Sequence, residues 1–319
     1  MKILIADSFP ESYQSELVKN GHQITSNPSL QGDTLTETVG SYEILIVRST
    51  KVDANTLDAG KSLKLVIRAG AGTNNIDKAH AAENGIRVCN VPGANAMAVA
   101  ELAIGLIICI DRNIPNNVSD LKNKVWAKKK YSSAQGLYGQ KLGLIGLGAI
   151  GLAVAERANV FGIQVHAVAK PGRSEDAKKR ISDIGIRQLE SVDELLSTCD
   201  IISLHLPVTP ETNKMVDKTF LEKMKDGATL INTSRGDLVD EAALIEAMET
   251  KGIRAGLDVY DNEPGSGAGR FDSAIASHPG VCGTHHIGAS TEQAQMAVAE
   301  GVLQVIQSYQ QGNLRNCVN

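Results

Sequence analysis

One glycine-rich segment constrains the fold of this chain more than any other part of the sequence. The apolar residues 142–145 lead directly into Gly-Leu-Gly-Ala-Ile-Gly at residues 146–151, and a helix-like run over residues 152–161 follows. Glycines also punctuate ordinary loops, but here a strand precedes and a helix follows. In that context the glycines permit a tight turn, a close backbone approach and close helix packing. The helix N-terminus then offers free amide groups to an anion. The order predicts a βαβ unit that binds the pyrophosphate of a dinucleotide.

Short apolar β-like runs alternate with helix-like runs along most of the chain. The β-like runs lie at residues 3–5, 44–47, 65–67, 87–89, 142–145, 164–169, 201–204, 228–231 and 255–259. Such alternation is typical of an α/β protein whose parallel sheets are covered by helices on both faces. A helix that is apolar nearly all round is expected over residues 96–112, and a final helix over residues 292–309.

The length of 319 residues suits about two domains. We expect two doubly wound parallel-sheet domains. The first comprises residues 1–95 and takes back the last helix, within residues 287–319. The second, residues 96–286, carries the glycine motif and is inserted into the first as one block.

Composition narrows the class of protein. A net charge of −4 argues against a general nucleic-acid binder, which usually carries a basic face. The five cysteines are scattered without a Cys-x-x-Cys, which is typical of free thiols in a reducing cytoplasm and not of a disulfide framework or a metal site. No signal peptide is visible, and the longest apolar run, residues 102–110, is about half of a bilayer span. We expect a cytoplasmic protein that binds neither nucleic acid nor membranes.

Three polar segments downstream of the glycine motif each follow a predicted strand, at residues 232–241, 257–264 and 283–291. Ligands of open α/β sheets sit outside the carboxyl ends of the strands, so Arg235, Glu263 and His286 could converge there. A histidine can take up a hydroxyl proton, a neighbouring carboxylate stabilises the protonated ring, and an arginine can hold a substrate carboxylate. These residue types suit the oxidation of an alcohol by hydride transfer to a nicotinamide.

Each residue also has a structural interpretation. Arg235 could bridge or cap the following helix through Asp237 or Asp240, and the glutamate could be an exposed turn residue. His286 could be a satisfied core histidine, with His285 as the chemical one. Their shared position after consecutive strands favours the functional interpretation for the set, because loops at that edge carry sites.

The chain resembles the D-isomer-specific 2-hydroxyacid dehydrogenases over nearly its whole length. Besides the segments above, the motifs that carry the resemblance are Arg-Ala-Gly-Ala-Gly at residues 68–72, Val-Pro-Gly-Ala-Asn-Ala at 91–96 followed by Val-Ala-Glu at 99–101, and Ser-Leu-His-Leu-Pro at 203–207. The resemblance implies a Rossmann cofactor domain inserted into a flavodoxin-like substrate domain. It is closest to the branch of the family that oxidises 3-phospho-D-glycerate.

The resemblance also implies catalytic and substrate-binding roles. His286 would be the acid/base, Glu263 its carboxylate partner and Arg235 the arginine that binds the substrate carboxylate. Arg48 resembles the arginine that binds the substrate phosphate, and Lys128 lies near the place where a basic residue reaches a neighbouring subunit's site. A solvated face is the alternative for the lysines at 128–130. Backbone amides would hold the carboxylate as well, in the loop formed by Ala69, Gly70, Ala71 and Gly72.

The implied cofactor is NAD, with NADP as an alternative. The implied binding residues are Gly146, Gly148, Ala149, Ile150, Gly151, Lys170, His205, Pro207, Thr233, Asp258 and Gly288. Of these, Asp258 would contact the nicotinamide carboxamide. An acidic residue is expected about 20 residues after the glycines, to bind the ribose 2′-hydroxyl of NAD. Lys170 and Arg173 lie there instead and could attract a 2′-phosphate. Glu175 or Asp176 could still serve NAD if the loop folds back.

Three other features depart from the family pattern. Asn74 stands where an aspartate is usual, and His285 stands where a proline is usual. The chain stops soon after the returning helix, without the serine-binding regulatory domain of longer relatives, so we expect no allosteric inhibition by serine.

The expected function is oxidation of 3-phospho-D-glycerate to 3-phosphohydroxypyruvate, the entry step of serine synthesis. One alternative is a glyoxylate or hydroxypyruvate reductase that uses NADPH. Another is a non-enzymatic NADH-sensing binding protein of the same fold. The resemblance implies a homodimer formed through the helix at residues 96–112 and the segment around Trp126.

Overall fold

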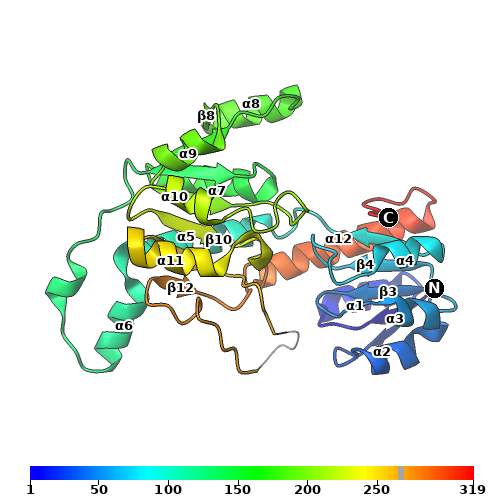
Figure 1. The fold of residues 1–319 in the computed structure, drawn as a ribbon. Helices are drawn as coiled ribbons and strands as arrows, with labels where there is room; N and C mark the ends of the chain where they lie inside the picture. The colour runs from blue at the N-terminus through cyan, green and yellow to red at the C-terminus, as the bar shows by residue number, and fades with distance from the viewer. Residues whose placement is uncertain (265–268) are drawn as a thin grey trace. The chain divides into compact units, whose positions relative to one another are not determined.

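The computed structural model describes residues 1–264 and 269–319, and these form two compact units. Unit 1 consists of Met1–Asn95 together with Ala289–Asn319. Unit 2 is the intervening Ala96–Gly288. The chain therefore builds unit 1 from two segments that are distant in sequence (Figure 1).

Unit 1 is built on a five-stranded parallel sheet with the strand order β2-β1-β3-β4-β5. Its strands are β1 (Lys2–Ile5), β2 (Gln23–Ser26), β3 (Ile44–Val47), β4 (Leu65–Arg68) and β5 (Arg87–Asn90). This order is the flavodoxin-like doubly wound order. The central strands are continuous apolar runs because both faces of the sheet are covered.

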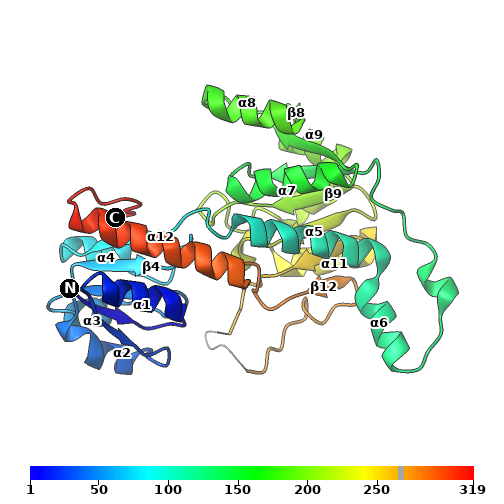
Figure 2. The same ribbon diagram turned by 180° about the vertical axis from the view of Figure 1, so that it is seen from behind.

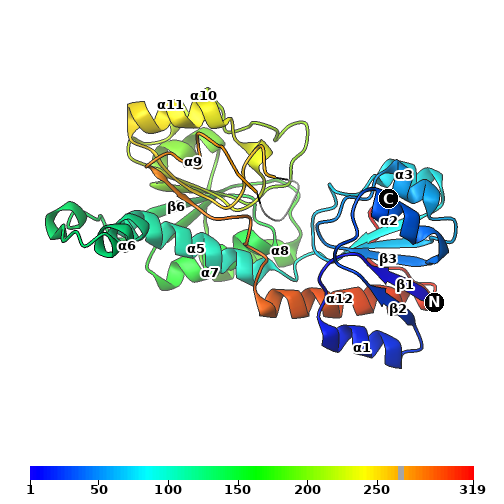
Figure 3. The same ribbon diagram turned by 90° about the horizontal axis from the view of Figure 1, so that it is seen from below.

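Helices cover both faces of this sheet, as Figures 2 and 3 show. One face packs against α1 (Glu11–Lys19) and α12 (Glu292–Gln310), which contribute Leu17 and Leu303 to the core. The other face packs against α2 (Asp33–Thr38), α3 (Ala54–Ala59) and α4 (Lys78–Glu83). A short 3-10 helix, η1 (Val39–Ser41), follows α2. The segment after residue 289 thus supplies one of the helices that complete this unit.

Unit 2 contains a larger parallel sheet, with the order β12-β11-β10-β9-β6-β7-β8 among the described residues. Its strands are β6 (Lys141–Ile145), β7 (Gln164–Val168), β8 (Arg187–Leu189), β9 (Ile201–Leu204), β10 (Thr229–Asn232), β11 (Arg254–Leu257) and β12 (Val281–Gly283). The order reverses at β6, which pairs with β7 on one side and β9 on the other. That arrangement is the Rossmann switch point. The predicted α/β class, with one Rossmann and one flavodoxin-like domain, is confirmed.

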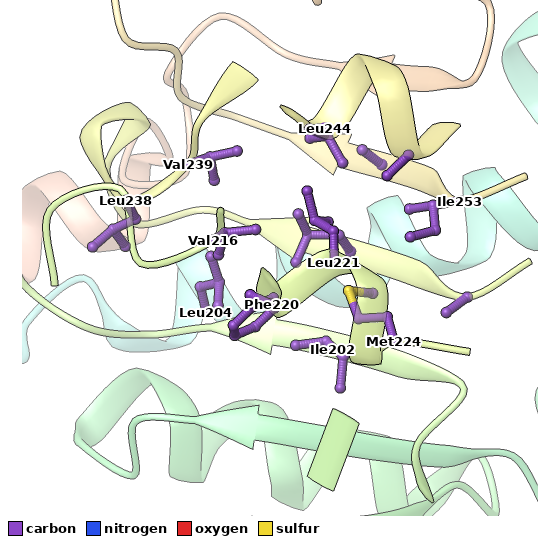
Figure 4. Packing of buried hydrophobic residues seen from close by; sticks show 14 of the residues in the cluster. Ile202, Leu204, Val216, Phe220, Leu221, Met224, Leu238, Val239, Leu244 and Ile253 are labelled. Carbon is purple, nitrogen blue, oxygen red and sulfur yellow. The ribbon is translucent and has the colours of Figure 1, made fainter. Parts of the chain in front are cut away.

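The helices of unit 2 also form two layers. On one face lie α5 (Ala96–Arg112), α7 (Ala149–Val160) and α8 (Glu175–Ile184). On the other lie α9 (Val192–Thr198), α10 (Lys218–Lys223) and α11 (Glu241–Lys251). Figure 4 shows Phe220 and Leu221 of α10 and Leu244 of α11 packed with residues of the sheet. The predicted bounds of α5 are confirmed, and its buried face reflects the apolar pattern read from the sequence.

Two short helices, α6 (Ile114–Lys122) and the 3-10 helix η2 (Lys128–Tyr131), connect α5 to β6. No residue of α6 is buried, and Ile114, Val118 and Leu121 form an exposed apolar stripe at helical spacing. Trp126, beyond this helix, is 82% exposed. A third 3-10 helix, η3 (Gly236–Leu238), follows β10.

Candidate active site

The glycine turn after β6 has the local geometry that a pyrophosphate site requires. Gly146 has a φ of 107°, and a Cβ there would come 2.2 Å from the carbonyl oxygen of His205. A Cβ on Gly151 would come 2.0 Å from the carbonyl oxygen of Gly146. By contrast, Gly148 directly precedes α7, and a Cβ there would meet nothing within 4 Å. Two glycines are therefore required by the protein itself, whereas Gly148 borders open space at a helix N-terminus.

Two buried polar atoms at the carboxyl edge of this sheet have no partner among the described residues. They are Nδ1 of His205, which follows β9, and Oγ1 of Thr233, which follows β10. Burial lowers the pKa of His205 to about 4, so its ring is neutral at pH 7, and its Nε2 lies 2.9 Å from Oγ of Ser203. Buried polar groups without a partner call for a missing one. The residues at this edge of the sheet therefore fit a polar dinucleotide.

The loop after β7 offers no carboxylate where the ribose of a dinucleotide is expected. Lys170 is exposed there, while the guanidinium of Arg173 donates to the carbonyl of Val168 and to Gln188, both at 3.2 Å. Glu175 begins α8 and pairs with Lys178 at 2.7 Å. Glu175 thus has a partner within its own helix, while Lys170, Glu175 and Asp176 are all exposed to solvent.

A histidine–carboxylate pair joins the loops that follow β11 and β12. Nδ1 of His286 lies 2.6 Å from Oε2 of Glu263, and the other oxygen of Glu263 accepts the amide of Tyr260 at 2.9 Å. Burial alone would raise the pKa of Glu263. The hydrogen bonds from His286 and Tyr260, with the charges of His286 and Arg235, hold that pKa below its ordinary value instead. The side chain of His286 is 48% exposed, which excludes a core role, and its Nε2 has no hydrogen-bond partner among the described residues.

Asp258 builds the loop that carries the histidine. Its carboxylate is 1% exposed and accepts the Thr284 hydroxyl at 2.6 Å and the amides of Ile287 and Gly288, both at 2.8 Å. The amide of His286 donates to the Asp258 carbonyl at 2.8 Å, and His286 itself has a φ of 51°. The family resemblance implied a cofactor contact for Asp258. It did not indicate that Asp258 positions this loop, nor that Thr284 donates to its carboxylate. A polar segment after a strand was the only signal for either.

Arg235 follows β10 in a turn that packs tightly on the Tyr260 backbone. A Cβ on the next residue, Gly236, would come 2.0 Å from the carbonyl carbon of Tyr260. The Arg235 guanidinium donates to the Ser234 carbonyl at 2.6 Å. Asp240 caps α11 with its own carboxylate, so the structure does not use Arg235 for that cap. His285 is exposed, and His286 is the histidine that contacts the carboxylate.

The remaining predicted residues of this unit lie at its surface. Lys128 is exposed at the start of η2, whereas Lys130 pairs with Asp120 at 2.9 Å and lies over the Tyr131 ring. Pro207 follows His205 in the loop after β9. Ala149 and Ile150 form the first turn of α7.

Unit 1 places Arg48 and the loop at residues 69–72 after β3 and β4, neighbouring strands of its own sheet. The amide of Arg48 donates to Oδ2 of Asp7 at 2.6 Å, and its guanidinium donates to the Ser290 hydroxyl at 3.3 Å. The carbonyl of Arg48 accepts Nε of Arg68 at 3.1 Å. Arg48 is thus held at the carboxyl edge of the sheet, beside a hydroxyl group.

The loop at residues 69–72 is held by its neighbours. The amides of Ala69 and Gly70 donate to the carbonyls of Val47 and Arg68, at 2.7 and 2.8 Å. The side chain of Asn90 donates to the Ala71 carbonyl at 2.6 Å. Among the described residues, the amides of Ala71 and Gly72 have no acceptor. Of the four amides expected to hold a substrate carboxylate, Ala69 and Gly70 already have backbone acceptors. Nothing in the structure explains the asparagine at position 74.

Within the described parts of the chain, no group of three or more His, Cys, Asp or Glu side chains could hold a metal ion. None of the described helices is long and apolar enough to cross a membrane.

Several known proteins are similar to this chain in sequence. The family model described as D-isomer specific 2-hydroxyacid dehydrogenase, NAD binding domain, matches residues 104–288. The chain is 39% identical to a D-3-phosphoglycerate dehydrogenase of Archaeoglobus fulgidus over all of its own length, but it spans 59% of that relative. It is 40% identical to a hydroxypyruvate reductase of Thermotoga maritima, over 90% of this chain and 91% of that relative.

The chain is also similar in fold to a solved dehydrogenase structure. The chain matches an NAD⁺-bound 3-phosphoglycerate dehydrogenase of Entamoeba histolytica with a TM-score of 0.81 and 27% identity, covering 100% of this chain and 98% of that one.

Proposed function

The chain belongs to the D-isomer-specific 2-hydroxyacid dehydrogenase family, whose members are NAD-binding oxidoreductases, and we propose that it oxidises 3-phospho-D-glycerate to 3-phosphohydroxypyruvate. The observation that carries the dehydrogenase chemistry is the contact between His286 and Glu263. The substrate is proposed from the names of relatives and from Arg48. Such a reaction would stand at the entry to serine synthesis.

The proton chemistry follows from the geometry of unit 2. His286 uses Nδ1 for Glu263, so its exposed Nε2 takes the proton of the substrate hydroxyl. The imidazolium that forms is stabilised by the Glu263 carboxylate, which is ionised at neutral pH because its pKa lies below the ordinary value. Arg235 binds the substrate carboxylate and stabilises negative charge on the reacting oxygen.

The dinucleotide would be held by the glycine turn, His205 and Thr233, whose unpartnered polar atoms support this assignment. The chemistry that a bound nicotinamide supplies is acceptance of the hydride. We propose that the ribose end accepts NADP as well as NAD. Lys170 can attract a 2′-phosphate, and residues 169–174 of this loop contain no carboxylate to repel one.

Unit 1 carries the residues that we propose for the substrate phosphate and carboxylate. Arg48 and the Ser290 hydroxyl that it contacts offer donors for a phosphate, and the amides of Ala71 and Gly72 offer donors for the carboxylate. Lys128 is proposed as a second cation for the phosphate site of a neighbouring subunit. The proposed homodimer would form through α5 and the segment around Trp126, and it would also cover the exposed apolar stripe of α6.

A second candidate function is reduction of hydroxypyruvate or glyoxylate. It is favoured by the hydroxypyruvate reductase of Thermotoga maritima, which this chain matches over 91% of that relative's length. A substrate without phosphate has no use for Arg48 as a ligand. The first function therefore requires Arg48 to bind the substrate phosphate, whereas the second does not.

One experiment separates them. Initial rates of reduction of phosphohydroxypyruvate, hydroxypyruvate and glyoxylate would be measured with NADH and NADPH, in the wild type and in Arg48→Ala. Preference for the phosphorylated substrate that is lost in Arg48→Ala supports the first function. Faster turnover of the unphosphorylated acids, unchanged in Arg48→Ala, supports the second. Tight NADH binding without turnover of any of them would indicate the binding protein.

A further inference from the structure

Two cysteines that are far apart in sequence face each other in unit 1. Cys89 lies in β5, at the edge of the sheet, and Cys317 pairs with it in an isolated antiparallel bridge. The amide of Asn90 donates to the Asn316 carbonyl at 3.1 Å, and the amide of Val318 donates to the Val88 carbonyl at 2.8 Å. These hydrogen bonds flank the cysteine pair on both sides. The two cysteines therefore occupy a non-hydrogen-bonded pair of an antiparallel ladder.

That type of pair has the spacing that a disulfide needs. Cα atoms of a non-hydrogen-bonded pair lie about 4.5 Å apart, and disulfides bridge Cα atoms about 4.4–6.8 Å apart. Both thiols are free in the structure. They are also neighbours. Burial raises the pKa of Cys89 to about 12, and the charge and hydrogen bonding of the Cys317 thiol add to that rise.

The two thiols differ in access. Cys317 is exposed, whereas Cys89 is fully buried. A reagent in solution therefore meets Cys317 first, and Cys89 is reached only through its neighbour. This asymmetry is that of an attacking and a resolving cysteine.

The segment that carries Cys317 is joined to β5 by more than this bridge. The Asn319 side chain accepts the Val88 amide and donates to the Ile86 carbonyl, each at 2.8 Å. Residues 316–319 thus cover the outer edge of β5, and Figure 1 shows the red end of the chain returning to the sheet of unit 1. A covalent bond here would join the two chain segments from which unit 1 is built.

We propose that Cys89 and Cys317 form a reversible disulfide that clips residues 289–319 to residues 1–95 within unit 1. The oxidant is a small-molecule disulfide of the glutathione class. The Cys317 thiolate attacks one of its sulfurs, the S–S bond breaks and one small thiolate leaves. The Cys89 thiolate then attacks Sγ of Cys317 in this mixed disulfide, and the second small thiolate leaves. The two protein thiols lose two protons and two electrons, and the small disulfide is reduced to two thiols.

The proposed disulfide between Cys89 and Cys317 would affect the stability of unit 1, and it lies close to the loop at residues 69–72. Closing a long loop removes entropy from the unfolded chain, which stabilises the folded one. Asn90, the residue after Cys89, donates to the Ala71 carbonyl, so the clipped strand also anchors the loop at residues 69–72. The proposal does not rest on the proposed function, because bond formation and thermal stability can be measured without turnover.

The test incubates the full chain with oxidised and reduced glutathione at several ratios, followed by non-reducing peptide mapping and thermal unfolding. We expect a peptide pair linked through Cys89 and Cys317 and a Tm higher by about 5 °C or more, reversed by dithiothreitol. Cys317→Ser changes an exposed side chain, so it keeps the fold and abolishes both effects. Cys109→Ser is the matched control. It removes a second pair of neighbouring cysteines, Cys109 and Cys282. Burial, with a smaller contribution from Cys109, raises the pKa of Cys282 to about 11.

A second measurement follows the rate. Because the buried Cys89 thiol must ionise, the step from mixed disulfide to clip should accelerate about tenfold per pH unit between pH 7 and 9. Accumulation of glutathionylated Cys317 without a link to Cys89, or a link only between Cys109 and Cys282, would overturn the proposal. So would a crosslink only between chains.

Discussion

Nδ1 of His286 lies 2.6 Å from Oε2 of Glu263, and this contact joins loops that follow two adjacent strands, β11 and β12. The histidine is half-exposed while the carboxylate is more enclosed. The pair therefore presents one ring nitrogen to a ligand and keeps its counter-charge inside the protein.

The first prediction concerns acid stability. The pKa of Glu263 lies below its ordinary value of 4.5. A carboxyl group whose pKa falls on folding contributes stability that is complete above the ordinary pKa and is lost as pH falls through the folded value. Glu263→Gln should lower the free energy of unfolding at pH 7 by about 1.5 kcal/mol, and this difference should shrink below about pH 4.5.

Denaturant midpoints at pH 7 and below about pH 4.5 measure this difference in stability. Glu249→Gln is the control because Glu249 is exposed on α11. A Glu263→Gln deficit that stays constant into acid would show that the carboxylate charge is not what stabilises the pair.

The second prediction separates two glycines of the same motif. Gly148→Ala adds a Cβ that meets nothing in the protein, at a φ of −77° that alanine adopts readily. Gly151→Ala adds a Cβ 2.0 Å from a carbonyl oxygen. We expect Gly148→Ala to keep its Tm but bind NADH at least about tenfold more weakly, a loss of about 1.4 kcal/mol. Gly151→Ala should have both a lower Tm and a weaker affinity for NADH. Calorimetric binding and thermal unfolding measure these two properties. An unchanged NADH affinity in Gly148→Ala would show that the pyrophosphate does not bind at this turn.

The third prediction concerns Asp258. Replacing its carboxylate with an amide puts a donor against the donors of Thr284, Ile287 or Gly288 in a buried place. Asp258→Asn should destabilise the protein by about 1–3 kcal/mol and lower kcat because His286 loses its position. Asp261→Asn is the control, since among the described residues the carboxylate of Asp261 has only a long 3.7 Å contact with Lys214. Equal stability of the two variants would mean that the loop does not depend on the carboxylate.

The fourth prediction concerns the choice of dinucleotide. Lys170→Ala should lower kcat/KM for NADPH by about tenfold, or ~1.4 kcal/mol, and leave that for NADH nearly unchanged. Lys179→Ala, an exposed lysine of α8, should alter neither. A wild-type preference for NADH of at least about a hundredfold, or ~2.7 kcal/mol, would contradict NADP use.

How much of this could be predicted from sequence depends on burial. Central strands such as β3 are apolar throughout because helices cover both faces, and they are recognisable as short apolar runs. The edge strands β2 and β8 expose polar side chains, so the same criterion misses them. The glycine turn is recognisable because φ and close packing dictate glycine at Gly146 and Gly151.

The site shows the same division. The partnership of Glu263 with His286 could be inferred because both follow strands of one sheet. The role of Asp258 could not, since it depends on which way three amide and hydroxyl groups turn in a loop. Nor could the pairing of Cys89 with Cys317, because no spacing rule connects a strand of the first segment of unit 1 with the end of the second.

The most direct test of the account is His286→Asn. Asparagine tolerates the left-handed φ of 51° at this position, so the loop should survive the change. We expect kcat for phosphohydroxypyruvate reduction to fall by about 10²–10⁴-fold, while the Kd for NADH stays within about threefold of the wild type, or ~0.7 kcal/mol. A variant that keeps wild-type kcat would contradict the assignment of His286 as the proton-transferring residue.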